Sequence, residues 1–115
     1  MALKWYGLLE KNLELGDKII KIYEGKLDGK SGYLCLSKRK LLFAQEKGFM
    51  RNNYDLTLNL TYDQIVTVFG KGGFNLIISE TGGREYKFYA FDVPASIIER
   101  SFEELTYVSF AHNYL

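Results

Sequence analysis

Seven short strand-like segments, followed by one amphipathic helix, constrain the fold of this chain more than any other feature of its sequence. No stretch between two of these segments is long enough for a helical crossover, so neighbouring strands are expected to pair antiparallel. The segments cover residues 17–25, 31–37, 40–46, 56–61, 65–69, 74–80 and 84–90.

The fourth segment is the clearest strand, because Leu56, Leu58 and Leu60 alternate with polar residues. A period of two residues places one face of a strand in a core and the other in water. The Asp-Gly pair at residues 28–29 predicts a tight hairpin turn. The Gly-Lys-Gly-Gly run at residues 70–73 lacks the spacing of a phosphate-binding loop and precedes a strand, so it also predicts a hairpin turn.

Two helices are expected outside the strands. Residues 3–13 have partly helical spacing of large apolar side chains and predict a short N-terminal helix. The C-terminal helix is expected over residues 94–107 or longer, because Asp92 can cap its amides and Pro94 suits its first turn. Its apolar stripe is formed by Ile98, Phe102 and Leu105.

Length and composition place the chain among ordinary globular domains. With 115 residues, 47% of them hydrophobic and 25% charged, it is large enough for one core, and we expect a single domain over residues 1–115. The aromatic content of 16% favours strands, where flat rings pack well on a pleated surface.

The sequence offers no convincing catalytic or metal site. Cys35 is the only cysteine and lies in an apolar run, so it is interpreted as a small buried residue, as in proteins of a reducing, cytoplasmic compartment. His112, the only histidine, lies near the chain end, where a general base is poorly positioned. One histidine and one cysteine do not make a zinc site unaided, so we expect neither catalysis nor a cofactor.

The charge is nearly balanced but unevenly distributed. A net charge of +1 argues against nucleic-acid binding. The first 51 residues carry a net charge of +5 and the remaining residues carry −4. Part of the surface is therefore expected to be basic, unless folding interleaves the charges.

Three segments resemble the pleckstrin-homology-like superfamily, especially its prokaryotic members, and the related GRAM-type domains. They are the strand entry Leu13-Glu14-Leu15-Gly16-Asp17-Lys18-Ile19-Ile20, the hairpin Gly32-Tyr33-Leu34-Cys35-Leu36-Ser37-Lys38-Arg39-Lys40-Leu41-Leu42-Phe43, and the passage Leu60-Thr61-Tyr62-Asp63-Gln64-Ile65-Val66-Thr67-Val68. With the final helix, the likeness spans residues 13–107.

The resemblance implies a mainly β fold. Seven antiparallel strands over residues 17–90 would form a barrel of two nearly orthogonal sheets, capped by the C-terminal helix and accompanied by the short N-terminal helix. The rival architecture is an up-and-down barrel of lipocalin type with an internal cavity. That rival needs eight or more strands, and only seven are visible.

In the family architecture, the loops one–two, three–four and six–seven gather at the open end of the barrel. Cations beside exposed apolar side chains are what an anionic membrane surface favours, at about 1 kcal/mol for each Lys or Arg. Strand two lacks the basic-x-basic pair typical of phosphoinositide binders, so only weak lipid binding is expected. The candidate anion- and lipid-binding residues are Lys26, Lys30, Lys47, Phe49, Met50, Arg51 and Arg84.

Two functional hypotheses follow for a non-catalytic module. We favour protein–protein interaction or self-association, because the lipid pattern is incomplete and an aromatic-rich sheet can expose Tyr and Phe to a partner. The alternative is a peripheral module that binds anionic lipid at the inner membrane face through the loops named above.

Overall fold

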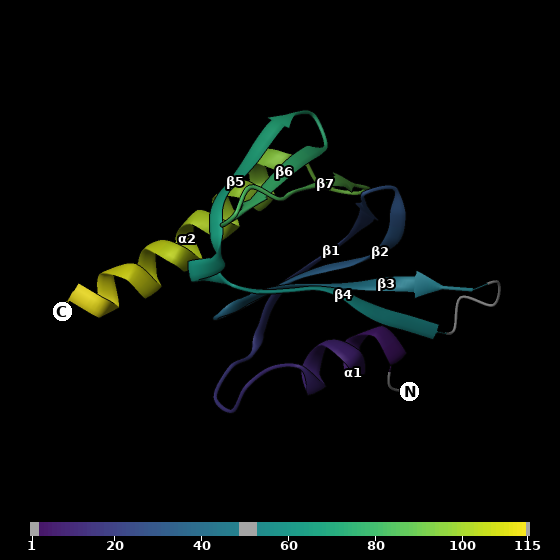
Figure 1. Ribbon diagram of the computed structural model, residues 1–115, viewed down its shortest axis with the longest axis horizontal. Helices are drawn as coiled ribbons and strands as arrows, with labels where there is room; N and C mark the ends of the chain where they lie inside the picture. Colours follow the sequence, from purple (N-terminus) through teal and green to yellow (C-terminus); the bar gives the residue numbers. More distant parts are fainter. Residues whose placement is uncertain (1–2, 49–52, 115) are drawn as a thin grey trace.

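Seven antiparallel strands form one continuous sheet in the computed structural model, which describes residues 3–48 and 53–114 and the side chains of residues 3–48 and 53–106. The strand order is β4-β3-β2-β1-β7-β6-β5 (Figure 1). The strands are β1 (Ile19–Leu27), β2 (Lys30–Ser37), β3 (Lys40–Lys47), β4 (Asn53–Thr61), β5 (Ile65–Gly72), β6 (Asn75–Glu80) and β7 (Glu85–Ala90).

The predicted mainly β architecture is confirmed, with both helices. The helices are α1 (Lys4–Lys11) and α2 (Ala95–Tyr114). A short 3₁₀ turn, η1 (Tyr62–Gln64), leads from β4 into β5. The three strands β5–β7 stand at a steep angle to β1–β4, and the two parts of the sheet join where β1 pairs with β7 (Figure 1).

The turn predicted at residues 70–73 is wrong in its position. β5 continues through a bulge to Gly72, which pairs with Asn75, so the reversal falls at residues 73–74. Gly70 stays in the strand because α2 begins directly against it. A Cβ atom at Gly70 would lie 3.3 Å from the backbone of Ala95. This glycine therefore serves close packing of a helix on a strand rather than a turn.

The central strands β2 and β3 are buried on both faces along most of their length, so they do not alternate. Leu41 and Phe43 of β3 face the main core with β6, β7 and α2. Leu42 and Ala44 face the opposite way, where Leu9 of α1 covers them in a second cluster. Leu42 therefore lies in a different apolar cluster from its neighbours Leu41 and Phe43.

A pair of glycines marks the junction between the two parts of the sheet. Gly25 of β1 lies opposite Gly32 of β2 and also pairs with Ala90 of β7. A Cβ atom at Gly25 would lie 2.5 Å from the Phe88 ring, and one at Gly32 would lie 2.7 Å from the Phe43 ring. Each would also clash with a backbone carbonyl. The two aromatic rings therefore occupy space that these glycines leave open.

α2 packs on β5 and β6 through the predicted apolar stripe. Ile98 is 1% exposed, Phe102 is 8% exposed, and Leu105 is partly buried against the same core. The Phe102 ring meets the Tyr62 ring edge to face, with 5.4 Å between their centroids. The helix therefore holds the η1 turn as well as the sheet.

Gly25→Ala and Gly32→Ala are each expected to lower the free energy of unfolding by about 3 kcal/mol, because backbone carbonyls do not move aside for a methyl group. The matched control is Gly7→Ala in α1, where a Cβ atom has no neighbour within 4 Å. That change should stabilise the protein by about 0.5–1 kcal/mol, since alanine favours the helix. Urea titration of the three variants measures these effects, and equal stabilities would contradict the packing described.

Phe102→Ala should destabilise the fold by about 3–5 kcal/mol, because it removes a buried ring from the contact between α2 and the core. Chemical denaturation followed by tryptophan fluorescence gives this value. A loss below about 1 kcal/mol would mean that the C-terminal helix does not carry this core contact.

Candidate binding surface

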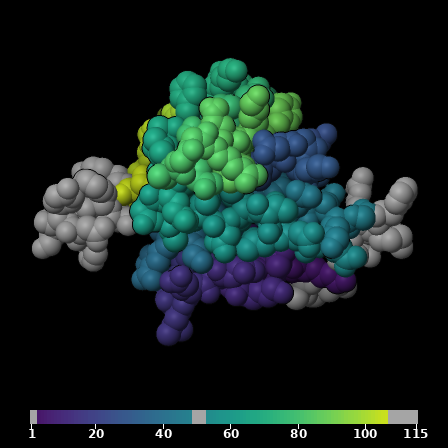
Figure 2. Space-filling model, viewed as in Figure 1, coloured from purple at the N-terminus to yellow at the C-terminus, as the bar shows by residue number. Residues whose placement is uncertain are grey.

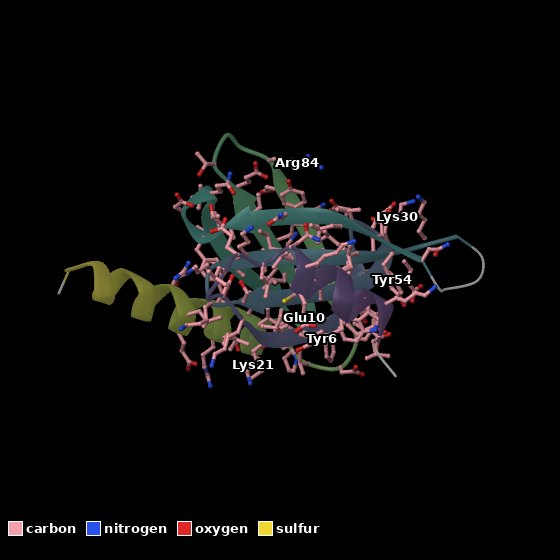
Figure 3. All side chains as sticks on the ribbon, turned by 90° about the horizontal axis from the view of Figure 1, so that it is seen from below. Tyr6, Glu10, Lys21, Lys30, Tyr54 and Arg84 are labelled. Carbon is pink, nitrogen blue, oxygen red and sulfur yellow. The ribbon has the colours of Figure 1, made fainter. Side chains whose placement is uncertain are left out.

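The candidate loop residues are not brought together as one described cluster. Lys47 is exposed, and its ammonium group lies 3.5 Å from the Asp55 carboxylate. The Arg84 guanidinium lies 4.7 Å above the centre of the Tyr86 ring. Figure 3 shows Lys30 and Arg84 on different parts of the surface. Phe49, Met50 and Arg51 lie outside the described residues, so their expected role in binding stays a prediction.

Lys26 has a different environment from the one expected in an open-end loop. It lies within β1, directly opposite Tyr89 of β7, and both side chains are exposed. Since opposite residues in a ladder share a face, the Lys26 ammonium group flanks the aromatic side of the sheet.

Cys35 is fully buried in the cluster beneath α1, as predicted. Burial, and to a lesser degree the Asp17 carboxylate, raises the pKa of its thiol to about 12. Burial likewise raises the pKa of the Tyr62 hydroxyl well above its ordinary value. The side chain of His112 lies outside the described side chains. Within the described residues, no group of three or more His, Cys, Asp or Glu is placed to hold a metal ion.

The most distinctive surface is the face of β5–β7 that points away from the core. β-strand alternation sends Tyr86, Phe88 and Ala90 of β7 inwards, so Tyr89 must point outwards. In the same way Phe69 of β5 points outwards and is 56% exposed. The sheet-face patch, as we name it, consists of Phe69, Phe74, Ile77, Tyr89 and Phe91.

Ring contacts show that this patch is continuous at one end. The Tyr89 ring lies 6.2 Å from the Phe74 ring and 6.4 Å from the Phe91 ring, centroid to centroid. Ile77 lies opposite Phe69 in the ladder between β5 and β6. A shallow groove of about 700 Å³ runs over Phe69 and Ile77.

Charges flank the apolar centre of the groove unequally. At one end lie Glu85 of β7 and Glu103 of α2. At the other end lie Lys71 of β5 and Glu99 of α2, which accepts a hydrogen bond from the Gly70 N–H, while Lys26 flanks the neighbouring Tyr89. Lys87 lies between the ends, opposite Ile77. The groove therefore has an acidic end and an end where lysines lie beside one carboxylate, separated by apolar side chains.

The free edge of β5 is partly occupied by the protein itself. α2 lies along this strand (Figure 1), and the Gly70 N–H donates a hydrogen bond of 2.6 Å to Oε1 of Glu99. An amide that would otherwise pair with an added strand is thus satisfied internally. The face of β5–β7, rather than this edge, is the accessible surface.

The general expectation of exposed aromatic residues did not identify these particular side chains. The alternation of Tyr86, Phe88 and Ala90 along the predicted strand 84–90 is the signal that could have indicated the opposite exposure of Tyr89. The sequence did not indicate that Phe69 and Tyr89 belong to one patch, because that depends on β6 pairing with β5 on one side and with β7 on the other.

Within the described residues, no helix has the length and apolar character needed to cross a membrane. No family model matches the chain, and no curated protein sequence matches it significantly.

A thiol reagent should not modify Cys35 in the native protein at pH 8, because the reactive thiolate is suppressed and the residue is covered by α1. After unfolding, the thiol should react at the rate of an exposed cysteine. Absorbance of the group that the reagent releases measures the labelling, and fast native labelling would contradict the burial.

The buried thiol also makes the free energy of unfolding fall between about pH 9 and 12, since the unfolded state loses this proton first.

Proposed function

We propose that this chain is a non-catalytic binding module of the pleckstrin-homology-like type that associates with a second copy of itself through the sheet-face patch. The order of seven antiparallel strands and one packed C-terminal helix supports the family assignment. The observation that carries the functional proposal is the exposed aromatic face of β5–β7.

Exposed aromatic residues are costly unless a partner covers them. Phe69 and Tyr89 are 56% and 48% exposed, and they stand on rigid strands. Aromatic side chains are enriched in the centres of protein interfaces, because each buries a large area and loses little conformational entropy. Burial of this patch against another protein surface would release its ordered water.

The distribution of charge favours a second copy of the chain as the partner. Two identical faces can meet around a two-fold axis that runs across the strands. This arrangement places the acidic end of each groove, with Glu85 and Glu103, against the end of the other copy that holds Lys71 and Lys26, with Phe69 and Ile77 near the axis. Self-complementary surfaces of this kind are what a two-fold interface requires.

Face-to-face packing is favoured over strand addition at β5. A strand added at that edge would have to displace Glu99 from the Gly70 amide and compete with α2 for the space beside β5. Packing on the opposite face of the strand disturbs neither contact. The proposed interface therefore leaves the fold of each copy unchanged.

The alternative proposal is weak binding of anionic lipid through the open-end loops. Its support is the exposure of Lys26, Lys30, Lys47 and Arg84. The salt bridge of Lys47 to Asp55 and the stacking of Arg84 on Tyr86 give two of these cations a partner within the chain. The four cations are also not gathered into one cluster within the described residues, whereas the sheet-face patch is continuous, so self-association is the function that we propose first.

Phe69→Glu is expected to abolish self-association, because it places a charge at the centre of a desolvated interface. Light scattering over a range of concentrations should give twice the mass of 13.3 kDa for the original chain and the single mass for the variant. Leu15→Glu is the matched control, since Leu15 is fully exposed and lies outside the patch. A concentration-independent single mass for the original chain would exclude the dimer.

A charge exchange tests the two-fold arrangement in the same assay. One variant combines Glu85→Lys with Glu103→Lys, and the other combines Lys26→Glu with Lys71→Glu. Each should remain monomeric alone, because both ends of its groove carry the same charge. An equimolar mixture should form a heterodimer, since every acidic end then meets a basic end. If both variants still dimerise alone, the proposed orientation is wrong.

A further inference from the structure

A second surface lies on the opposite side of the molecule, between α1 and the adjoining ends of β3 and β4. In Figure 2, α1 (purple) lies along the underside of β4 (teal). A groove of about 510 Å³ separates the helix from the strand ends. Its described lining is Lys4, Gly7, Leu8, Lys11, Lys47, Asn53, Tyr54 and Asp55. This surface is separate from the sheet-face patch.

Helical spacing explains how α1 presents two cations to the same groove. Lys4, Gly7 and Lys11 are separated by three and four residues, so they follow one side of the helix. Leu8, on the same side, is partly buried against the cluster that fixes α1 to the sheet. Leu9 is fully buried and anchors the helix. The positions of Lys4 and Lys11 are therefore set by packing.

Because Gly7 has no side chain, this helix face is recessed between Lys4 and Lys11. A Cβ atom at Gly7 would have no neighbour within 4 Å, so the space above it is open. A glycine within a helix costs roughly 1 kcal/mol relative to alanine. In α1 this glycine leaves a gap between Lys4 and Lys11, which both line the groove.

The charges on the groove are predominantly positive. Lys4 and Lys11 approach from the helix, and Lys47 approaches from the end of β3. Asp55 is the single carboxylate among the described lining residues, and it lies 3.5 Å from the Lys47 ammonium group. The groove thus carries a net charge of about +2 with its lysines ionised.

We propose that this groove binds a phosphate monoester, through the ammonium groups of Lys4, Lys11 and Lys47. A phosphate monoester carries a charge between −1.5 and −2 near pH 7 and has three acceptor oxygens, which suits a groove lined by three lysines. Lysine binds phosphate as a flexible point charge with several donors. The phosphate belongs either to a soluble molecule or to a lipid head group, and the chemistry at the groove is the same.

Asp55 acts as an internal competitor for the ligand. Its carboxylate lies 3.5 Å from the Lys47 ammonium group and would repel an approaching phosphate. Both side chains of this pair are more than half exposed, so the contact is easily exchanged for a phosphate contact. The affinity should therefore rise when Asp55 loses its charge, which a merely structural role for the pair would not produce.

Titration with inorganic phosphate and with glycerol 3-phosphate at low salt, followed by amide NMR shifts, tests the proposal. Shifts should concentrate in α1 and at the ends of β3 and β4. Lys11→Gln should weaken binding about fivefold, as expected for about 1 kcal/mol from one charge contact in water. Asp55→Asn should strengthen binding several-fold. Lys21→Gln is the matched control, because Lys21 is an exposed lysine of β1 outside the groove.

Salt and folding controls make the result decisive. Binding should weaken as ionic strength rises, because screening acts over about 8 Å at 0.15 M salt. The unfolding midpoints of the lysine variants should match that of the original chain, since these side chains are exposed. The proposal is overturned if millimolar phosphate gives no localised shifts, or if Lys21→Gln weakens binding as much as Lys11→Gln does.

A second measurement separates the two sources of phosphate. Vesicles with 20% phosphatidic acid in phosphatidylcholine are compared with pure phosphatidylcholine in a sedimentation assay. Sedimentation that Lys11→Gln reduces and glycerol 3-phosphate competes away identifies a lipid head group. Binding of glycerol 3-phosphate without sedimentation identifies a soluble ligand. Vesicle binding that is unchanged in Lys11→Gln, together with no binding of glycerol 3-phosphate, refutes the groove as the site.

Discussion

The close approach at Gly25 and Gly32 is the constraint on which the rest of this structure depends. These residues face each other across β1 and β2, and each leaves room for an aromatic ring, Phe88 and Phe43 respectively. The two rings meet with centroids 6.2 Å apart. Through this junction β1 belongs to both parts of the sheet, so β5–β7 can turn over the core and receive α2. A side chain at either glycine would push the strands apart where the two parts join.

The fold uses its two helices for different purposes. α2 completes the main core by covering β5 and β6, and its Glu99 satisfies an amide at the sheet edge. α1 instead covers the back of β3 and part of β4, so the middle of β3 is buried on both faces. The aromatic face of β5–β7 and the lysine-lined groove beside α1 lie on different parts of the molecule, so the two proposed interactions do not compete for space.

Local rules predicted the helices and strands well, but they do not indicate which residues distant in the sequence become neighbours. The Asp-Gly turn at residues 28–29 is confirmed, with φ values of 50° and 83° that suit a tight hairpin. The glycines at residues 70–73 predicted a turn that begins too early, because the packing of α2 on Gly70 keeps the strand extended there. Lys47 was selected for its loop, yet its neighbours Lys4 and Lys11 come from a helix more than 30 residues away in the sequence. Spacing along the chain carries no signal for such a contact.

The sequence by itself determined the succession of seven strands and a helix along the chain, the Asp-Gly hairpin turn, the apolar stripe of α2 and the burial of Cys35. Each depends on interactions between residues close in the chain, or on periodicity that is visible within one segment. The tertiary structure alone decided which face of each strand met which helix, and which charges became neighbours. Those outcomes depend on the register between strands and on the place where α1 docks. Both are set by the packing of side chains distant in sequence, so the two candidate surfaces became visible only in three dimensions.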